Sequence, residues 1–128
     1  MVETVIVLPV LLLIFFAIAE FGMLLGRFQT LNNAAREGAR TAVVWRANCT
    51  VATVQSEVET TVTNYAAGGQ VTLTPADITV TGACGGGGTN TTVTASYTFP
   101  FVILPGLAPG LGPSIDLSAS SVMRNEGA

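Results

Sequence analysis

An almost unbroken apolar run near the N-terminus constrains this chain more than any other feature. Residues 5–19 read VIVLPVLLLIFFAIA without a charged or strongly polar side chain, and FGMLLG resumes the pattern after Glu20. Residues 4–26 are therefore close to the ~20 residues that cross a hydrocarbon core. The dozen Val, Leu, Ile and Phe side chains of residues 5–19 favour insertion by about 4–7 kcal/mol, against a cost of roughly 3 kcal/mol for one central Glu. We expect lipid to solvate this segment before any protein partner covers it.

Helical periodicity continues beyond the apolar run. Apolar residues recur at helical spacing from residue 28 to residue 45, and polar residues fill much of the opposite face. The pattern predicts one helix that reaches about Arg46, roughly 60–65 Å long, within an N-terminal segment 1–47. A cleaved secretory signal is the alternative, but the residues before the run, Met1 to Glu3, include none of the basic side chains such a signal needs.

Residues 48–128 predict a small α+β head domain. Residues 50–67 carry Val51, Val54, Val58, Val62 and Tyr65 at helical spacing, and Gly68-Gly69 end this second helix. From Gln70 onward apolar residues alternate with Thr and Ser, which predicts an antiparallel sheet of about four strands. These strands are expected around residues 71–74, 78–81, 93–103 and 115–123.

The two cysteines, Cys49 and Cys84, predict a disulfide bond that ties the end of the long helix to the sheet. The bond would close a loop of about 35 residues and contribute about 3–4 kcal/mol in the loop-entropy description. It implies an oxidising compartment. The alternative is a pair of free, buried thiols.

Composition disfavours catalysis and nucleic-acid binding. The chain has no His, all five of its basic residues are Arg, and its net charge is −3. It therefore lacks the commonest general base and metal ligand, and it offers no basic face for phosphates. We expect no enzyme activity, no catalytic residue, no cofactor and no metal.

Charged residues in and beside the apolar run predict contacts between copies of the chain. Glu3 is costly to bury unless it is paired, and the N-terminal ammonium of a neighbouring copy could pair with it. Glu20 could meet Arg27 of an axially shifted neighbour, because Arg27 is too far along the same helix for a direct pair. The alternatives are a solvated Glu3 and a Glu20 whose carboxylate extends to the membrane interface.

Other residues complete the predicted contact surface. Pro9 predicts a kink or local unwinding, and Gly22 and Gly26 form a small-xxx-small pair that permits close helix packing. Residues 104–113, LPGLAPGLGP, predict a loop with exposed leucines that contacts adjacent subunits. The predicted subunit interface is Glu3, Pro9, Phe15, Phe16, Glu20, Gly22, Gly26, Arg27, Leu104, Leu107 and Leu111.

Four segments of the chain resemble TadE-like pseudopilins of the tight-adherence (Tad) branch of type IV pili. They are MVETVIVLP at 1–9, EFG at 20–22, NNAAREGAR at 32–40 and SSVMRNE at 120–126. The resemblance implies a type IV pilin-like fold and a short basic leader removed by a prepilin peptidase. It also implies extraction from the inner membrane by an ATPase-driven assembly machine, and a role for Glu3 in pairing with a neighbour's N-terminus.

We therefore expect a pilin subunit that polymerises with itself through its N-terminal helix into a cell-surface filament. Residues 4–26 would span the inner membrane before assembly and form the filament core afterwards. Four Arg residues lie between the apolar run and the predicted end of the helix, namely Arg27, Arg36, Arg40 and Arg46. By themselves they would favour a cytoplasmic head, so a removed basic leader is part of this hypothesis. The alternatives are a minor pseudopilin that primes or tips a Tad pilus, and a single-pass membrane-anchored binding domain.

Overall fold

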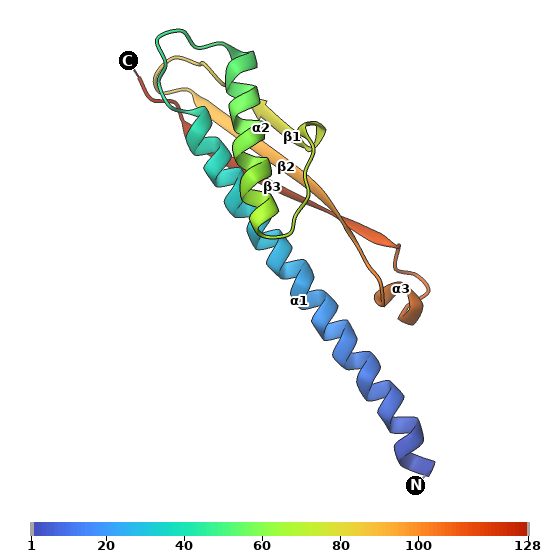
Figure 1. The fold of residues 1–128 in the computed structure, drawn as a ribbon. Coiled ribbons are helices and arrows are strands. Elements are labelled where there is room, and N and C mark those ends of the chain that lie inside the picture. The colour runs from blue at the N-terminus through green and yellow to red at the C-terminus, as the bar shows by residue number, and fades with distance from the viewer. Residues whose placement is uncertain (1, 128) are drawn as a thin grey trace.

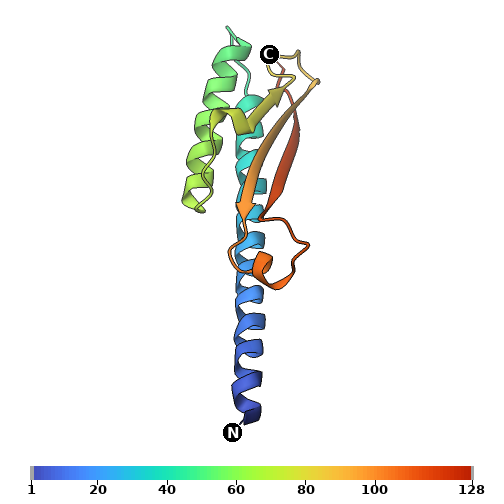
Figure 2. The same ribbon diagram turned by 90° about the vertical axis from the view of Figure 1, so that its right-hand side faces the viewer.

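A long helix projects from a small head in the computed structural model, which describes residues 2–127 (Figure 1). The helix α1 spans Val2–Ala42, and α2 (Val51–Gly68) lies beside its C-terminal half (Figure 2). Three strands complete the head: β1 (Ile78–Thr81), β2 (Asn90–Pro100) and β3 (Ser114–Arg124). A 3-10 turn, η1 (Pro75–Asp77), precedes β1, and the one-turn helix α3 (Leu104–Leu107) lies between β2 and β3. The predicted pilin-like α+β fold is confirmed.

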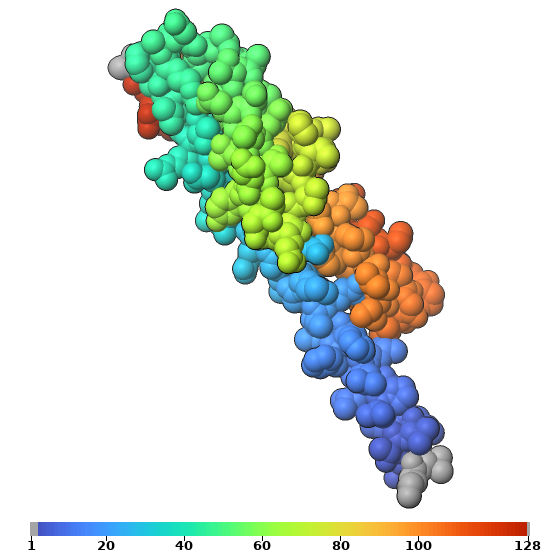
Figure 3. Space-filling view, viewed as in Figure 1, coloured from blue at the N-terminus to red at the C-terminus, as the bar shows by residue number. Residues whose placement is uncertain are grey.

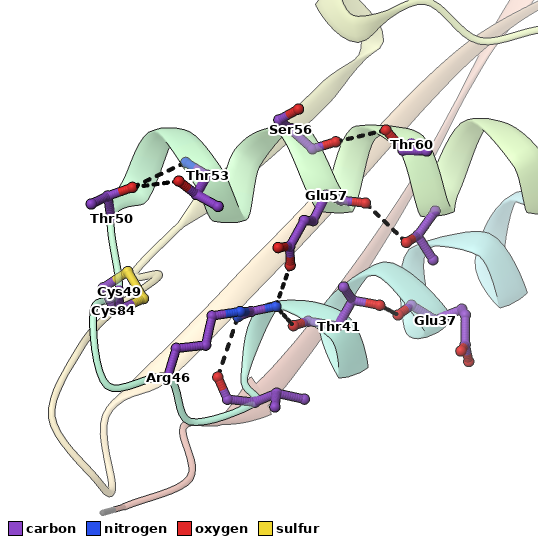
Figure 4. A network of polar contacts seen from close by, with 12 residues as sticks. Glu37, Thr41, Arg46, Cys49, Thr50, Thr53, Ser56, Glu57, Thr60 and Cys84 are labelled. Atoms are coloured by element: carbon purple, nitrogen blue, oxygen red, sulfur yellow. Dashed lines mark hydrogen bonds and ion pairs between the residues drawn. A yellow bond between two sulfur atoms is a disulfide. The ribbon is translucent and has the colours of Figure 1, made fainter.

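The first helix ends at Ala42, so the prediction that it reaches Arg46 is wrong. The last carbonyls of a helix lack intrahelical donors. Arg46 supplies one, because its Nη2 donates to the carbonyl oxygen of Thr41 at 3.2 Å and also pairs with Glu57 of α2 (Figure 4). The guanidinium caps α1 and joins it to α2, which takes the place of a further helical turn.

The second helix forms where the valine spacing predicts it. The hydroxyl of Thr50 accepts a hydrogen bond from the backbone N–H of Thr53 at 3.3 Å, which caps the first turn (Figure 4). The buried stripe follows i, i+4 spacing, so Val51 and Tyr65 of the predicted face are exposed. The residues on the buried stripe are Val54, Val58, Val62 and Ala66.

The sheet has three strands in the order β1-β2-β3, so the prediction of a further strand at residues 71–74 is wrong. The two apolar side chains of this segment are buried as expected, but two of its backbone N–H groups donate to partners outside the sheet. Val71 donates to the carbonyl of Ala66 at 3.0 Å, and Thr74 donates to the carboxylate of Asp77 at 2.8 Å. The segment therefore crosses to the sheet without joining it.

The central strand β2 ends at Pro100, not at Ile103 as the alternation predicts. Pro100 pairs with Ser114 of β3, but β1 reaches only as far as Ala95. Pro100 therefore has a free edge on its other side, as expected for a proline in a strand. Beyond it, the N–H of Phe101 donates to the carbonyl of Pro113 at 2.9 Å and closes the base of the loop that holds α3.

The core lies where α1, α2 and the sheet meet, and small residues on α1 bring these elements together. Ala34, Ala35, Ala39 and Ala42 are buried there. Gly38 lies at the closest approach: a Cβ at this position would overlap Val62 Cγ2 and lie 3.3 Å from side-chain atoms of Val58 and Val93. Alanine and glycine on α1 therefore determine how closely α2 can pack.

The predicted disulfide Cys49–Cys84 is present, with the two Cα atoms 5.6 Å apart. It joins the connection between α1 and α2 to the turn that follows β1 (Figure 4). The alternative of two free thiols is thereby excluded.

We predict that Gly38→Ala lowers the stability of the head by about 1–2 kcal/mol, because overpacking outweighs the gain in helix propensity. Thermal unfolding of the detergent-solubilised chain measures the effect. Gly22→Ala is the matched control on the same helix, because nothing lies within 4 Å of the added Cβ. Equal melting temperatures for the two variants would contradict the prediction.

Replacing both cysteines with serine should destabilise the head by about 3–4 kcal/mol. Denaturant unfolding, monitored by near-ultraviolet circular dichroism, tests this. A reductant should produce the same loss in the unsubstituted chain and none in the double variant. A double variant as stable as the unsubstituted chain would show that the crosslink contributes nothing.

Candidate functional site

The first half of α1 extends beyond the head as an uncovered apolar rod (Figure 3). Large hydrophobic side chains from Val5 to Phe16 are exposed on all sides, and Phe15 alone leaves 65% of its surface uncovered. Within residues 2–127, α1 is the one helix long and apolar enough to cross a membrane. This half of the helix therefore needs lipid or other protein chains to cover it.

Six predicted interface residues on α1 are exposed, namely Glu3, Pro9, Phe15, Phe16, Gly22 and Gly26. Glu3 is exposed, whereas Met1, whose α-amino group would pair with a neighbour's Glu3, lies outside the described residues. The helix continues through Pro9, so the expected local unwinding is absent there. A Cβ added at Gly22 or Gly26 would meet nothing within 4 Å, which leaves this side of the helix open for close packing.

Glu20 is buried, with 2% of its surface exposed, although it belongs to the apolar run. Its carboxylate accepts hydrogen bonds from three successive backbone N–H groups. Val102 donates to Oε1, Ile103 lies 3.2 Å from both oxygens, and Leu104 donates to Oε2 at 2.9 Å. The interaction attaches the loop between β2 and β3 to α1, and we call it the Glu20 clamp.

The clamp changes the interpretation of Glu20. The carboxylate does not need Arg27 of a neighbour to satisfy it, because the loop of its own chain supplies the donors. It does not extend to the interface as a solvated group either, since it is buried. Hydrogen bonds to a charged acceptor are about twice as strong as neutral ones, so three donors compensate well for burial.

Arg27 also has its partners within the chain. Its Nη1 donates to the hydroxyl of Tyr97 at 2.8 Å, and its guanidinium carbon lies 5.0 Å from the ring centroid of Phe99. Both aromatic residues belong to β2. Hydrogen bonding and cation–π attraction together attach the lower end of the sheet to α1.

The loop between β2 and β3 is the second apolar surface. Its residues 104–107 form α3 instead of the irregular chain that was expected. Leu107 and Leu111 are exposed as predicted, and Leu104 is half-buried. Val102 is the most exposed large hydrophobic residue within residues 3–127, with 85% of its surface uncovered, because its side chain points away while its N–H faces Glu20.

Sequence reasoning missed Val102, Tyr97 and Phe99 as partners of these sites. One pattern in the sequence pointed to the clamp: no basic residue lies within four positions of Glu20, so its partner had to come from elsewhere. The partner is 82 to 84 residues away along the chain. Helical and strand periodicity carry no information about a contact of that range.

Comparison with known proteins identifies the N-terminal part of the chain. Residues 1–40 match the TadE-like protein family. This confirms the resemblance predicted from the N-terminal motifs, and the match ends just before α1 does. No curated protein and no solved structure matches the chain.

We predict that Glu20→Gln releases the loop, because one amide oxygen replaces two carboxylate oxygens facing three N–H donors. Amide hydrogen exchange at residues 102–104 should accelerate, while exchange in the centre of β2 stays slow. Mass spectrometry of the detergent-solubilised chain measures both. Glu3→Gln is the matched control on the same helix, and unchanged loop exchange in Glu20→Gln would rule out the clamp.

Proposed function

We propose that this chain, whose residues 1–40 match the TadE-like protein family, is a structural pilin that polymerises into an extracellular Tad-like filament. The observation that carries the proposal is the uncovered apolar rod of α1 beneath a folded, disulfide-linked head. The rod is the polymerising part and the head is the outer surface. The role is structural and not enzymatic.

Two environments can solvate the rod in turn. In the inner membrane, lipid covers the rod, so the hydrophobic effect does not drive the rods of different copies to associate. Outside the membrane, contact with water makes association of these apolar side chains favourable, so other copies of α1 cover them in place of lipid. Extraction from the membrane therefore drives assembly, and the open side at Gly22 and Gly26 allows the helices to approach closely.

Glu3 is the group on the rod that sets the register between copies. A carboxylate in an apolar filament core is costly without a partner, and a neighbour's N-terminal ammonium provides one. Glu20 and Arg27 are engaged by the chain's own loop and sheet. Further contacts between subunits come from Phe15 and Phe16 on the rod and from the loop leucines.

The proposal implies partners that process and move the chain. A prepilin peptidase would remove a basic leader, and an inner-membrane assembly machine driven by an ATPase would extract the subunit. The chain would reside in the inner membrane before assembly and on the cell surface afterwards. The filament itself is a homopolymer without a cofactor.

A second candidate is a minor pseudopilin that primes or tips the filament, and the match over residues 1–40 is equally consistent with this role. Immunogold labelling of sheared filaments separates the two roles. Uniform decoration indicates the main subunit, whereas label confined to tips or sparse sites indicates a minor one. A membrane-anchored binding domain predicts that shearing releases no labelled fibre.

We predict that Glu3→Ala and Leu107→Asp each reduce the yield of sheared filaments severalfold, because one loses the register pair and the other charges an apolar contact. The membrane-fraction amount and the melting temperature of the solubilised chain should not change. Glu126→Gln, an exposed carboxylate on the head, is the control. Normal filament yields from Glu3→Ala and Leu107→Asp would remove these residues from the interface.

A further inference from the structure

We propose that the loop of residues 101–113 enters the lipid interface beside α1 while the chain resides in the membrane. The head would then contact the bilayer through a second, separate apolar element. This inference rests on the membrane-inserted form in the proposed function, and it adds a lipid contact for the head.

The Glu20 clamp sets the depth of the loop. Glu20 lies within the apolar run and holds the N–H groups of residues 102–104. It precedes Arg27 by seven residues, which places it about 10 Å further down the helix axis. Since the run that precedes Arg27 is expected to lie in hydrocarbon, the loop is held below the level of the Arg27 guanidinium. Interfacial segments are typically buried by about 5–10 Å, which fits this depth.

The side chains of the loop suit lipid better than water. The sequence from Phe99 to Ile115 contains no charged residue. Val102 is 85% exposed, and Leu107 and Leu111 are also exposed. In Figure 1 the loop, with α3, lies at the end of the head that faces the free half of α1. The loop therefore continues the apolar surface of the rod onto the head.

The backbone of the loop is also prepared for an apolar environment. A backbone N–H or C=O group that leaves water is costly unless it finds a partner within the protein. The clamp satisfies three N–H groups, and turns within the loop satisfy others. Pro105, Pro109 and Pro113 carry no N–H at all. The residues whose N–H groups donate within the chain are 101–104, 106, 108, 110 and 111.

Arg27 and Tyr97 mark the water-facing side of this contact. They lie next to each other above the clamp, with a hydrogen bond of 2.8 Å between them. Tyrosine and arginine are favoured at the boundary between hydrocarbon and water, where an apolar body and a polar tip are both solvated. The loop is held at the level of Glu20, and the polar pair lies nearer to the C-terminal end of α1. An element at the boundary between hydrocarbon and water has this order.

Tryptophan fluorescence in vesicles that contain bromine-labelled phosphatidylcholine tests the proposal on the full-length chain. The native Trp45 lies beyond the C-terminal end of α1 and is 52% exposed, so it reports a position away from the membrane. In a Trp45→Phe background, Leu107→Trp and Leu111→Trp report the loop, and Phe15→Trp reports the membrane-spanning part of α1. Two loop variants are used so that the loop is still probed if one of the substitutions disturbs folding.

The expected result is that the tryptophans at positions 107 and 111 are quenched severalfold more than Trp45 and have blue-shifted emission. Adding Glu20→Gln to Leu107→Trp should reduce the quenching. Quenching at position 15 but not at 107 or 111 would overturn the loop proposal alone. Absence of quenching at position 15 would overturn the membrane-inserted form as well. Protection of position 107 only in sheared filaments would show that a second copy, and not lipid, covers the loop.

Discussion

Exposing the apolar side chains of the first half of α1 to water is strongly unfavourable in free energy. The arrangement of the rest of the structure depends on this constraint. The helix presents large apolar side chains in every direction until Glu20, whereas one face of its second half is covered by α2 and the sheet. One continuous helix thus connects a part that needs an apolar solvent with a part that has its own core. The two parts are joined without an intervening linker, because α1 is continuous from Val2 to Ala42.

The head is attached to α1 by polar interactions at both ends and by small residues between them. Arg46 caps the upper end and pairs with α2, whereas Glu20 holds the loop at the lower end. Between these points, Gly38 and the buried alanines let α2 and the sheet pack closely. The position of the head along the helix is therefore determined by particular residues, so the length of rod left uncovered is determined as well.

The comparison with the family fits this division of the chain. The TadE-like match covers residues 1–40, which hold the rod and most of the helix surface that contacts the head. The head supplies a disulfide, a second helix and a three-stranded sheet. In the filament that we propose, the rod would carry assembly and the head would form the outer surface, with the loop of residues 101–113 linking the two.

The sequence by itself determined the elements that local periodicity specifies, which are the apolar helix, the valine stripe of α2 and the alternating strands. The presence of two cysteines determined their pairing. Tertiary structure decided where those elements end and which polar groups meet. The segment 71–74 alternates like a strand, yet its first and last N–H groups donate to Ala66 and Asp77. Glu20 has no basic residue within four positions along the helix, yet it receives donors from residues 102–104 of its own chain. Periodicity reports which side a residue faces, whereas a hydrogen bond across more than eighty residues exists only once the chain has folded.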